Sequence, residues 1–138
     1  MRPTAPTERP RTDVLAKLTK FAIVGLTGVL VNTVALVVLY QIVRLPLAAA
    51  STLAVETAIV NNFLLNDHWT FQRVDFSVVR FAKFNLVSLG GLAITVSTVY
   101  LLVGYASTNY VVANLLGIIL ATAWNFGLNI VWTWGWNG

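Results

Sequence analysis

The chain has 138 residues, of which 57% are hydrophobic and only 10% are charged, and its mean hydropathy is +0.76. A soluble domain carries roughly 25% charged residues, so this composition excludes a water-soluble globular protein and indicates a membrane protein. The net charge of +4 comes from arginines and lysines that flank apolar stretches. Membrane topology explains that distribution, so we do not expect binding to nucleic acid.

Residues 1–14 form a Pro- and Thr-rich segment, which we expect to be a disordered cytoplasmic tail. Four apolar stretches follow, at about residues 21–43, 47–65, 81–103 and 110–131. Each is long enough to cross a bilayer, which takes roughly 20 residues. The predicted fold class is therefore all-α, with four transmembrane helices in one domain over residues 15–135. Basic residues gather before the first stretch and between the second and third, which predicts that both termini are cytoplasmic.

The sequence contains an internal repeat with an offset of 63 positions. Asn-Phe-Leu-Leu-Asn-Asp-His-Trp-Thr at residues 62–70 recurs as Asn-Phe-Gly-Leu-Asn-Ile-Val-Trp-Thr at residues 125–133. The first copy covers about residues 20–71 and the second about residues 83–134, and each contains two apolar stretches. The repeating unit is therefore a membrane-spanning helical hairpin. Two crossings return the chain to the same side, so the copies are parallel and related by a pseudo-two-fold axis along the membrane normal.

Small residues recur at every fourth position of the second and fourth stretches. They are Ala50, Ala54 and Ala58 in the first copy, and Ala113, Gly117 and Ala121 in the second. Residues four apart share one face of a helix. Small side chains on one face allow close helix approach, so we interpret these rows as packing seams.

Glu56 lies about ten residues from each end of the second stretch, near the bilayer midplane. A carboxylate at that depth costs at least about 2.5 kcal/mol, which makes it a candidate site for a proton, a cation or a polar ligand. The alternatives are a protonated side chain bonded to Asn32 or Thr52, or a contact between subunits. The counterpart of Glu56 in the second copy is Ile119, so packing alone does not require a carboxylate.

Further candidate residues gather at the cytoplasmic ends of the helices. Asp67 lies near the same side of the second helix as Glu56 and Phe63, which predicts a polar line from mid-membrane to the cytoplasmic surface. Four asparagines of the repeated motif offer hydrogen-bond donors and acceptors: Asn62, Asn66, Asn125 and Asn129. Four basic residues either bind phosphate or only set the topology: Lys20, Arg73, Arg80 and Lys83.

No motif of an enzyme centre is present in the sequence. There is no Gly-rich nucleotide loop and no nucleophile elbow. His68 is the only histidine and the chain has no cysteine, so we expect neither a metal site nor disulfides. The predictions are that the chain is not an enzyme and has no cofactor.

The chain resembles the GtrA-like family over about residues 15–135. The matching residues are Lys20-Phe21 with Val24-Gly25, the string from Asn62 to Phe71, Phe81 with Lys83-Phe84, and Asn125-Phe126 with Asn129 and Trp132. The resemblance implies a bacterial-type inner membrane and a polyprenyl-phosphate-linked sugar as substrate, in the synthesis of cell-surface polysaccharide. Members typically have basic residues after the second Asn of the motif, where this chain has Asp67-His68 and Ile130-Val131. A phosphate-binding role therefore shifts to Lys20, Arg73, Arg80 and Lys83.

The sequence thus predicts translocation, or flipping, of a polyprenyl-phosphate sugar across the cytoplasmic membrane. The predicted substrate-binding residues are Glu56, Asn62, Asn66, Asp67, Asn125, Asn129, Lys20, Arg73, Arg80 and Lys83. One four-helix bundle is thin for enclosing a sugar, so we expect a homodimer or a partner such as a membrane glycosyltransferase. The first alternative is a non-transporting scaffold that recruits such a glycosyltransferase. The second is a small proton-coupled drug exporter, although those carry their membrane glutamate in the first span.

Overall fold

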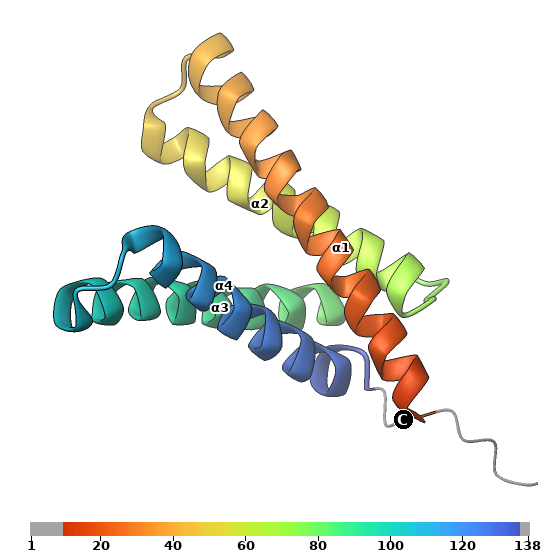
Figure 1. The fold of residues 1–138 in the computed structure, drawn as a ribbon. Helices are drawn as coiled ribbons and strands as arrows, with labels where there is room; N and C mark the ends of the chain where they lie inside the picture. Colours follow the sequence, from red (N-terminus) through yellow and green to blue (C-terminus); the bar gives the residue numbers. More distant parts are fainter. Residues whose placement is uncertain (1–9, 136–138) are drawn as a thin grey trace, which may run out of the picture.

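The computed structural model describes residues 10–135 and is helical throughout its long elements, with no strand in that range. Its helices are α1 (Pro10–Val37), α2 (Leu47–Leu65), α3 (Val78–Ala106) and α4 (Tyr110–Leu128) (Figure 1). Single π-helical segments extend three of them: η1 (Val38–Ile42), η2 (Asn66–Thr70) and η3 (Asn129–Thr133). All four helices are long and apolar enough to cross a membrane. The predicted all-α fold with four spans is confirmed.

The described part of α1 begins earlier than the sequence predicted. Its first residue is Pro10, so residues 10–14 of the expected disordered tail are helical. Proline suits the first turn of a helix because that turn needs no donor from its backbone nitrogen. Residues 1–9, the rest of the expected tail, lie outside the described residues.

The helices form two hairpins, α1 with α2 and α3 with α4. Figure 1 shows that the hairpins meet where α1 begins, α4 ends and the α2–α3 connection lies, and that they diverge towards their turns. Within each hairpin the small-residue rows are buried, and a Cβ added to Gly117 would lie 3.1 Å from the Thr95 backbone. The interpretation of these rows as packing seams is therefore confirmed.

The repeat extends to the details of the backbone. Arg44 and Ser107 occupy the two hairpin turns, 63 positions apart, and have φ angles of 63° and 51°. Gln72 and Gly135 are also 63 positions apart, with φ angles of 53° and 59°. Segments η2 and η3 have the same offset and the same length. Both copies therefore fold in the same way, as expected for two parallel repeats.

Aromatic side chains join the hairpins where they meet, and we call this end of the bundle the aromatic end. Phe21 packs edge-on against Phe126 at 5.5 Å, and the ring centroids of Phe63 and Phe84 lie 5.7 Å apart. These two contacts are equivalent under the repeat. Phe71 and Trp134 are themselves counterparts, and their rings stack at 4.2 Å with an interplanar angle of 9°. The pseudo-two-fold axis therefore passes between these two rings.

Candidate functional site

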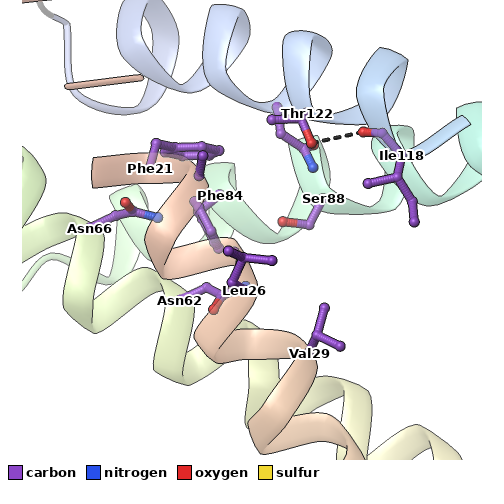
Figure 2. A pocket seen from close by; sticks show the side chains of 12 residues that line it. Phe21, Leu26, Val29, Asn62, Asn66, Phe84, Ser88, Ile118 and Thr122 are labelled. Carbon is purple, nitrogen blue, oxygen red and sulfur yellow. Dashed lines mark hydrogen bonds between the residues drawn. The ribbon is translucent and has the colours of Figure 1, made fainter. Parts of the chain in front are cut away.

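A cavity of about 330 Å³ lies between the two hairpins, adjacent to the aromatic end (Figure 2). Its polar lining consists of three side-chain amides and two hydroxyls, from Asn62, Asn66, Asn125, Ser88 and Thr122. The rings of Phe21 and Phe84 also contact it. Pockets for small molecules begin at about 300 Å³, so the volume suits one small polar group. Every polar group in this lining is uncharged, which favours hydroxyl-bearing ligands over ions.

Asn66 is the most buried of the cavity amides. Only 1% of it is exposed, and its Oδ1 accepts a hydrogen bond from Thr70 Oγ1 at 2.8 Å. Its Nδ2 has no acceptor among the described residues and is left to donate into the cavity. The counterpart Asn129 accepts from Thr133 Oγ1 at 2.6 Å. Asn129 does not line the cavity, although its buried Nδ2 also has no partner in the described part of the chain.

Two glycines hold the other cavity amides in place. A Cβ added to Gly28 would lie 2.3 Å from Asn62 Oδ1, and one added to Gly91 would lie 2.6 Å from Asn125 Oδ1. Both positions therefore require glycine for the asparagine to fit. Asn125 Oδ1 is buried without a donor among residues 10–135. Buried acceptors are normally paired, so this atom is suited to a ligand hydroxyl or a water.

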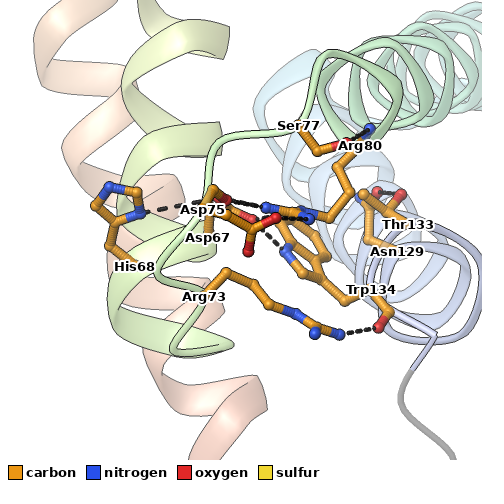
Figure 3. Close-up of polar contacts among 9 residues, drawn as sticks. All are labelled: Asp67, His68, Arg73, Asp75, Ser77, Arg80, Asn129, Thr133 and Trp134. Carbon is orange, nitrogen blue, oxygen red and sulfur yellow. Dashed lines mark hydrogen bonds and ion pairs between the residues drawn. The ribbon is translucent and has the colours of Figure 1, made fainter.

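Asp67 lies away from the cavity, at the aromatic end, in a buried ion pair (Figure 3). Its Oδ1 accepts from Arg80 Nε at 2.9 Å and from Trp134 Nε1 at 2.7 Å. Arg80 also pairs with Asp75 at 3.6 Å, and Arg73 Nη2 donates to the Trp134 carbonyl at 2.7 Å. These contacts link the α2–α3 connection to the end of α4. Asp67, Arg73 and Arg80 are thus engaged with the protein, and the geometry does not present them to the cavity.

The two predicted lysines have a shared arrangement that the sequence analysis missed. Lys20 Nζ lies 5.4 Å from the ring centroid of Trp69, and Lys83 Nζ lies 5.4 Å from that of Trp132. Both distances fall within the range of cation–π contacts. The contact joins the first helix of each hairpin to the end of its second helix, which explains why the tryptophan recurs in the motif. The sequence did contain a signal for this arrangement. Lys20 and Lys83 are 63 positions apart, and so are Trp69 and Trp132.

Glu56 does not lie with the asparagines. It is exposed on α2, and Asn85 Nδ2 of α3 lies 3.5 Å from its Oε2. Neither alternative partner is used: the Thr52 hydroxyl donates to the Ala48 carbonyl at 2.8 Å, and no bond to Asn32 is formed within residues 10–135. Glu56 therefore contacts the second hairpin from outside the cavity.

The predicted polar line from Glu56 to Asp67 is interrupted. Both residues do face α3, as their spacing indicated, because they contact Asn85 and Arg80. However, Phe63 lies between them on the same face and packs against Phe81 and Phe84 of α3 at 5.2 and 5.7 Å. The prediction of a continuous polar line was therefore wrong. Helical periodicity indicates which residues share a face of α2, but not that Phe63 fills the space on that face with an aromatic contact to α3.

Comparison with known proteins identifies the family. The chain is 36% identical over 120 residues to a dolichol-phosphate mannosyltransferase of Pyrococcus furiosus. That alignment covers 86% of this chain, but the chain spans only 34% of the relative. The profile of the family described as "GtrA/DPMS, transmembrane domain" matches residues 20–134, a range that includes every cavity residue and both hairpins except the first ten residues of α1. The chain therefore belongs to the GtrA/DPMS transmembrane-domain family.

Proposed function

We propose that the chain moves a polyprenyl-phosphate-linked sugar across the cytoplasmic membrane by passing the sugar through the cavity while the isoprenoid tail stays in lipid. The observation that carries this proposal is the cluster of uncharged amides and hydroxyls in a cavity between membrane-spanning hairpins. Such groups are costly in hydrocarbon unless they find partners. The hydroxyls of a sugar would supply those partners. The name of the mannosyltransferase relative supports a polyprenyl phosphate as the lipid class.

Basic residues at the aromatic end would attract the phosphate. Lys20 and Lys83 lie over tryptophan rings at the helix ends and each keeps N–H groups for a further acceptor. With both termini cytoplasmic, these lysines would lie at the inner leaflet. They are better placed for this role than Arg80, whose guanidinium is paired with Asp67 and Asp75.

The fold also indicates where movement would occur. The hairpins are joined by the aromatic pairs and by the contacts of Asp67 with Arg80 and Trp134, and they diverge towards their turns (Figure 1). Phe21 and Phe84 lie both in those pairs and in the cavity lining. Separation of these pairs would open the cavity towards the aromatic end. Net direction would come from consumption of the sugar by a glycosyltransferase on the outer face.

Leaflet exchange by the purified chain tests this function. The protein is reconstituted in liposomes with a labelled polyprenyl-phosphate sugar, and the label accessible from outside is followed over time. The proposal predicts exchange faster than in protein-free liposomes of the same composition. Exchange no faster than in empty liposomes would rule out transport by the chain alone.

A scaffold that recruits a membrane glycosyltransferase is the second candidate. It is favoured by one observation: the chain aligns with only about a third of its relative, which is named as a mannosyltransferase. A membrane domain can position an enzyme at its lipid substrate without moving lipid. This candidate predicts co-purification with a glycosyltransferase together with no lipid exchange by the chain alone. No such feature of the described residues favours a drug exporter.

A further inference from the structure

The cavity departs from the pseudo-symmetry of the bundle. Its exposed apolar lining comes from Ala22, Leu26 and Val29 on α1 and from Ile118 on α4. At the positions 63 residues away, in the other copy of the repeat, the counterparts are Asn85, Leu89, Leu92 and Val55. None of these four lines the cavity. The cavity is therefore displaced from the axis towards the gap between α1 and α4, where Leu26 is 71% exposed and Val29 is 65% exposed.

The equivalent gap on the other side of the axis, between α2 and α3, has a different character. Glu56 and Asn85 face each other across it at 3.5 Å. Their counterparts, Ile119 and Ala22, are both apolar. A hydrocarbon chain placed in the α2–α3 gap would have to cover a carboxyl and an amide, which is unfavourable. At the α1–α4 gap the most exposed lining side chains are apolar, and the Thr122 hydroxyl is already bonded to the Ile118 carbonyl.

We infer that the gap between α1 and α4 is the lateral portal through which the isoprenoid chain of the lipid remains in the bilayer while its head occupies the cavity. This inference rests on the proposed function. Leu26, Val29 and Ile118 form the apolar contact for the isoprenoid tail of the lipid. The amides line the same cavity. Figure 2 shows Leu26, Val29 and Ile118 on the two sides of this cavity, with Ser88 between them.

Gly25 gives the portal its width. A Cβ added there meets nothing within 4 Å, although the residue lines the cavity. Its counterpart is Ser88, which lines the same cavity. Gly25→Phe therefore adds bulk at the portal from a Cβ position that meets no neighbour. Gly104 is a matched control because a Cβ added there also meets nothing within 4 Å, and it does not line the cavity.

Photo-crosslinking with counterpart positions tests the portal. Benzoylphenylalanine replaces Leu26 or Ile118 on the portal side, and Leu89 or Val55 at the counterpart positions, in protein reconstituted with phosphatidylethanolamine, phosphatidylglycerol and tritiated polyprenyl phosphate. The portal predicts labelling at least about fivefold stronger at residues 26 and 118 than at residues 89 and 55. Excess unlabelled polyprenyl phosphate should abolish that labelling. Gly25→Phe should reduce it, and Gly104→Phe should not.

The possible results separate the portal from the proposed function. Competed labelling that is equal at all four positions, or stronger at residues 89 and 55, would overturn the portal while leaving lipid binding intact. Labelling at residues 26 and 118 that unlabelled polyprenyl phosphate does not reduce would mean that bulk lipid fills the gap, and this would also overturn it. The absence of competed labelling at all four positions, together with absent leaflet exchange, would overturn both.

Discussion

At the scale of single residues, the pairing of Asp67 with Arg80 shows what one sequence does not specify. Both were predicted to contact substrate, Arg80 as a cation for the phosphate and Asp67 as part of a polar line from Glu56. The structure pairs them with each other, and Asp67 also accepts a hydrogen bond from Trp134. Their counterparts, Ile130 and Lys17, do not form a pair of opposite charges. The repeat therefore did not indicate that Asp67 and Arg80 pair with each other. The partner of a buried charge depends on tertiary contacts that spacing along one helix does not define.

The Asp67–Arg80 pair leads to a prediction about stability. Arg80→Met leaves the fully buried Asp67 carboxylate without its cation, and losing one partner of a buried pair costs about 3–5 kcal/mol. Asp67→Asn in the same chain removes the uncompensated charge and retains an acceptor for Trp134. The double variant should therefore have a higher free energy of unfolding than Arg80→Met alone, measured by denaturant titration in detergent.

Val74→Ala is the control for that measurement, because Val74 is 99% exposed and should contribute little. Equal unfolding free energies for Arg80→Met and the double variant would show that the charge of Asp67 is not the cause of the loss.

The candidate site was partly predictable at this scale. Asn62, Asn66 and Asn125 were named from the repeated motif and do lie together in the cavity. Ser88 and Thr122 were not named as ligands, since a single hydroxyl in an apolar helix has no distinctive spacing. Glu56 was named from its depth in the span, but depth does not determine whether a side chain faces a cavity or the lipid. The structure places it outside the cavity lining.

At the scale of elements, the two hairpins satisfy the same backbone carbonyl in different ways. In the first hairpin Asn61 donates to Thr27 Oγ1 at 3.2 Å, and Thr27 donates to the Val24 carbonyl at 2.7 Å. In the second, Trp124 Nε1 donates directly to the counterpart carbonyl of Val87 at 3.1 Å. The indole of Trp124 is larger than the amide of Asn61, and it fits because Gly90 stands where the first hairpin has Thr27. A Cβ added to Gly90 would lie 2.7 Å from Trp124 Nε1.

This exchange predicts a compensating pair of substitutions. Gly90→Thr alone overpacks against Trp124 and should lower the free energy of unfolding by about 1–3 kcal/mol. Gly90→Thr with Trp124→Asn recreates the arrangement of the first hairpin and should recover most of that loss. Thermal unfolding in detergent provides the comparison, with Gly104→Thr as a control at a glycine that has open space. A double variant less stable than Gly90→Thr alone would contradict the equivalence of the hairpins.

The elements themselves were largely predictable. Apolar length gave the four helices and the 63-residue offset gave their grouping into hairpins, and both agree with the structure. The π-helical segments η1, η2 and η3 were not predicted. These segments differ from an α-helix in their hydrogen bonds, such as the one from Trp134 N to Asn129 O at 3.0 Å. They do not differ in residue composition, so a hydropathy pattern cannot predict them.

At the scale of the whole molecule, Glu56 provides a reason to expect a homodimer. A single copy leaves this side chain exposed about 15 Å from the start of its helix, at mid-depth in the bilayer. Polar contacts between membrane helices contribute about 0.6–2 kcal/mol, so a second copy over this face would lower the cost. Glu56→Leu should therefore weaken dimerisation about threefold or more, as counted by single-molecule photobleaching in liposomes.

The repeat supplies the control for that measurement. Ile119→Leu changes the counterpart position without altering polarity, and Ile119 is 63% exposed, so the dimer fraction should not change. An equal dimer fraction for the wild-type chain and the Glu56→Leu variant, or a wholly monomeric wild type, would contradict a contact through this face.

The central claim is that the amides in the cavity carry the sugar across the membrane. The measurement that tests it most directly is the leaflet-exchange rate of Asn62→Leu, Asn66→Leu and Asn125→Leu beside Asn114→Leu, a change at an exposed α4 residue outside the cavity lining. One lost hydrogen bond contributes about 1 kcal/mol, so each cavity variant should slow exchange about fivefold, and the triple variant far more. Asn114→Leu should match the wild-type rate. A folded triple variant that exchanges the lipid as fast as the wild-type chain would contradict the account.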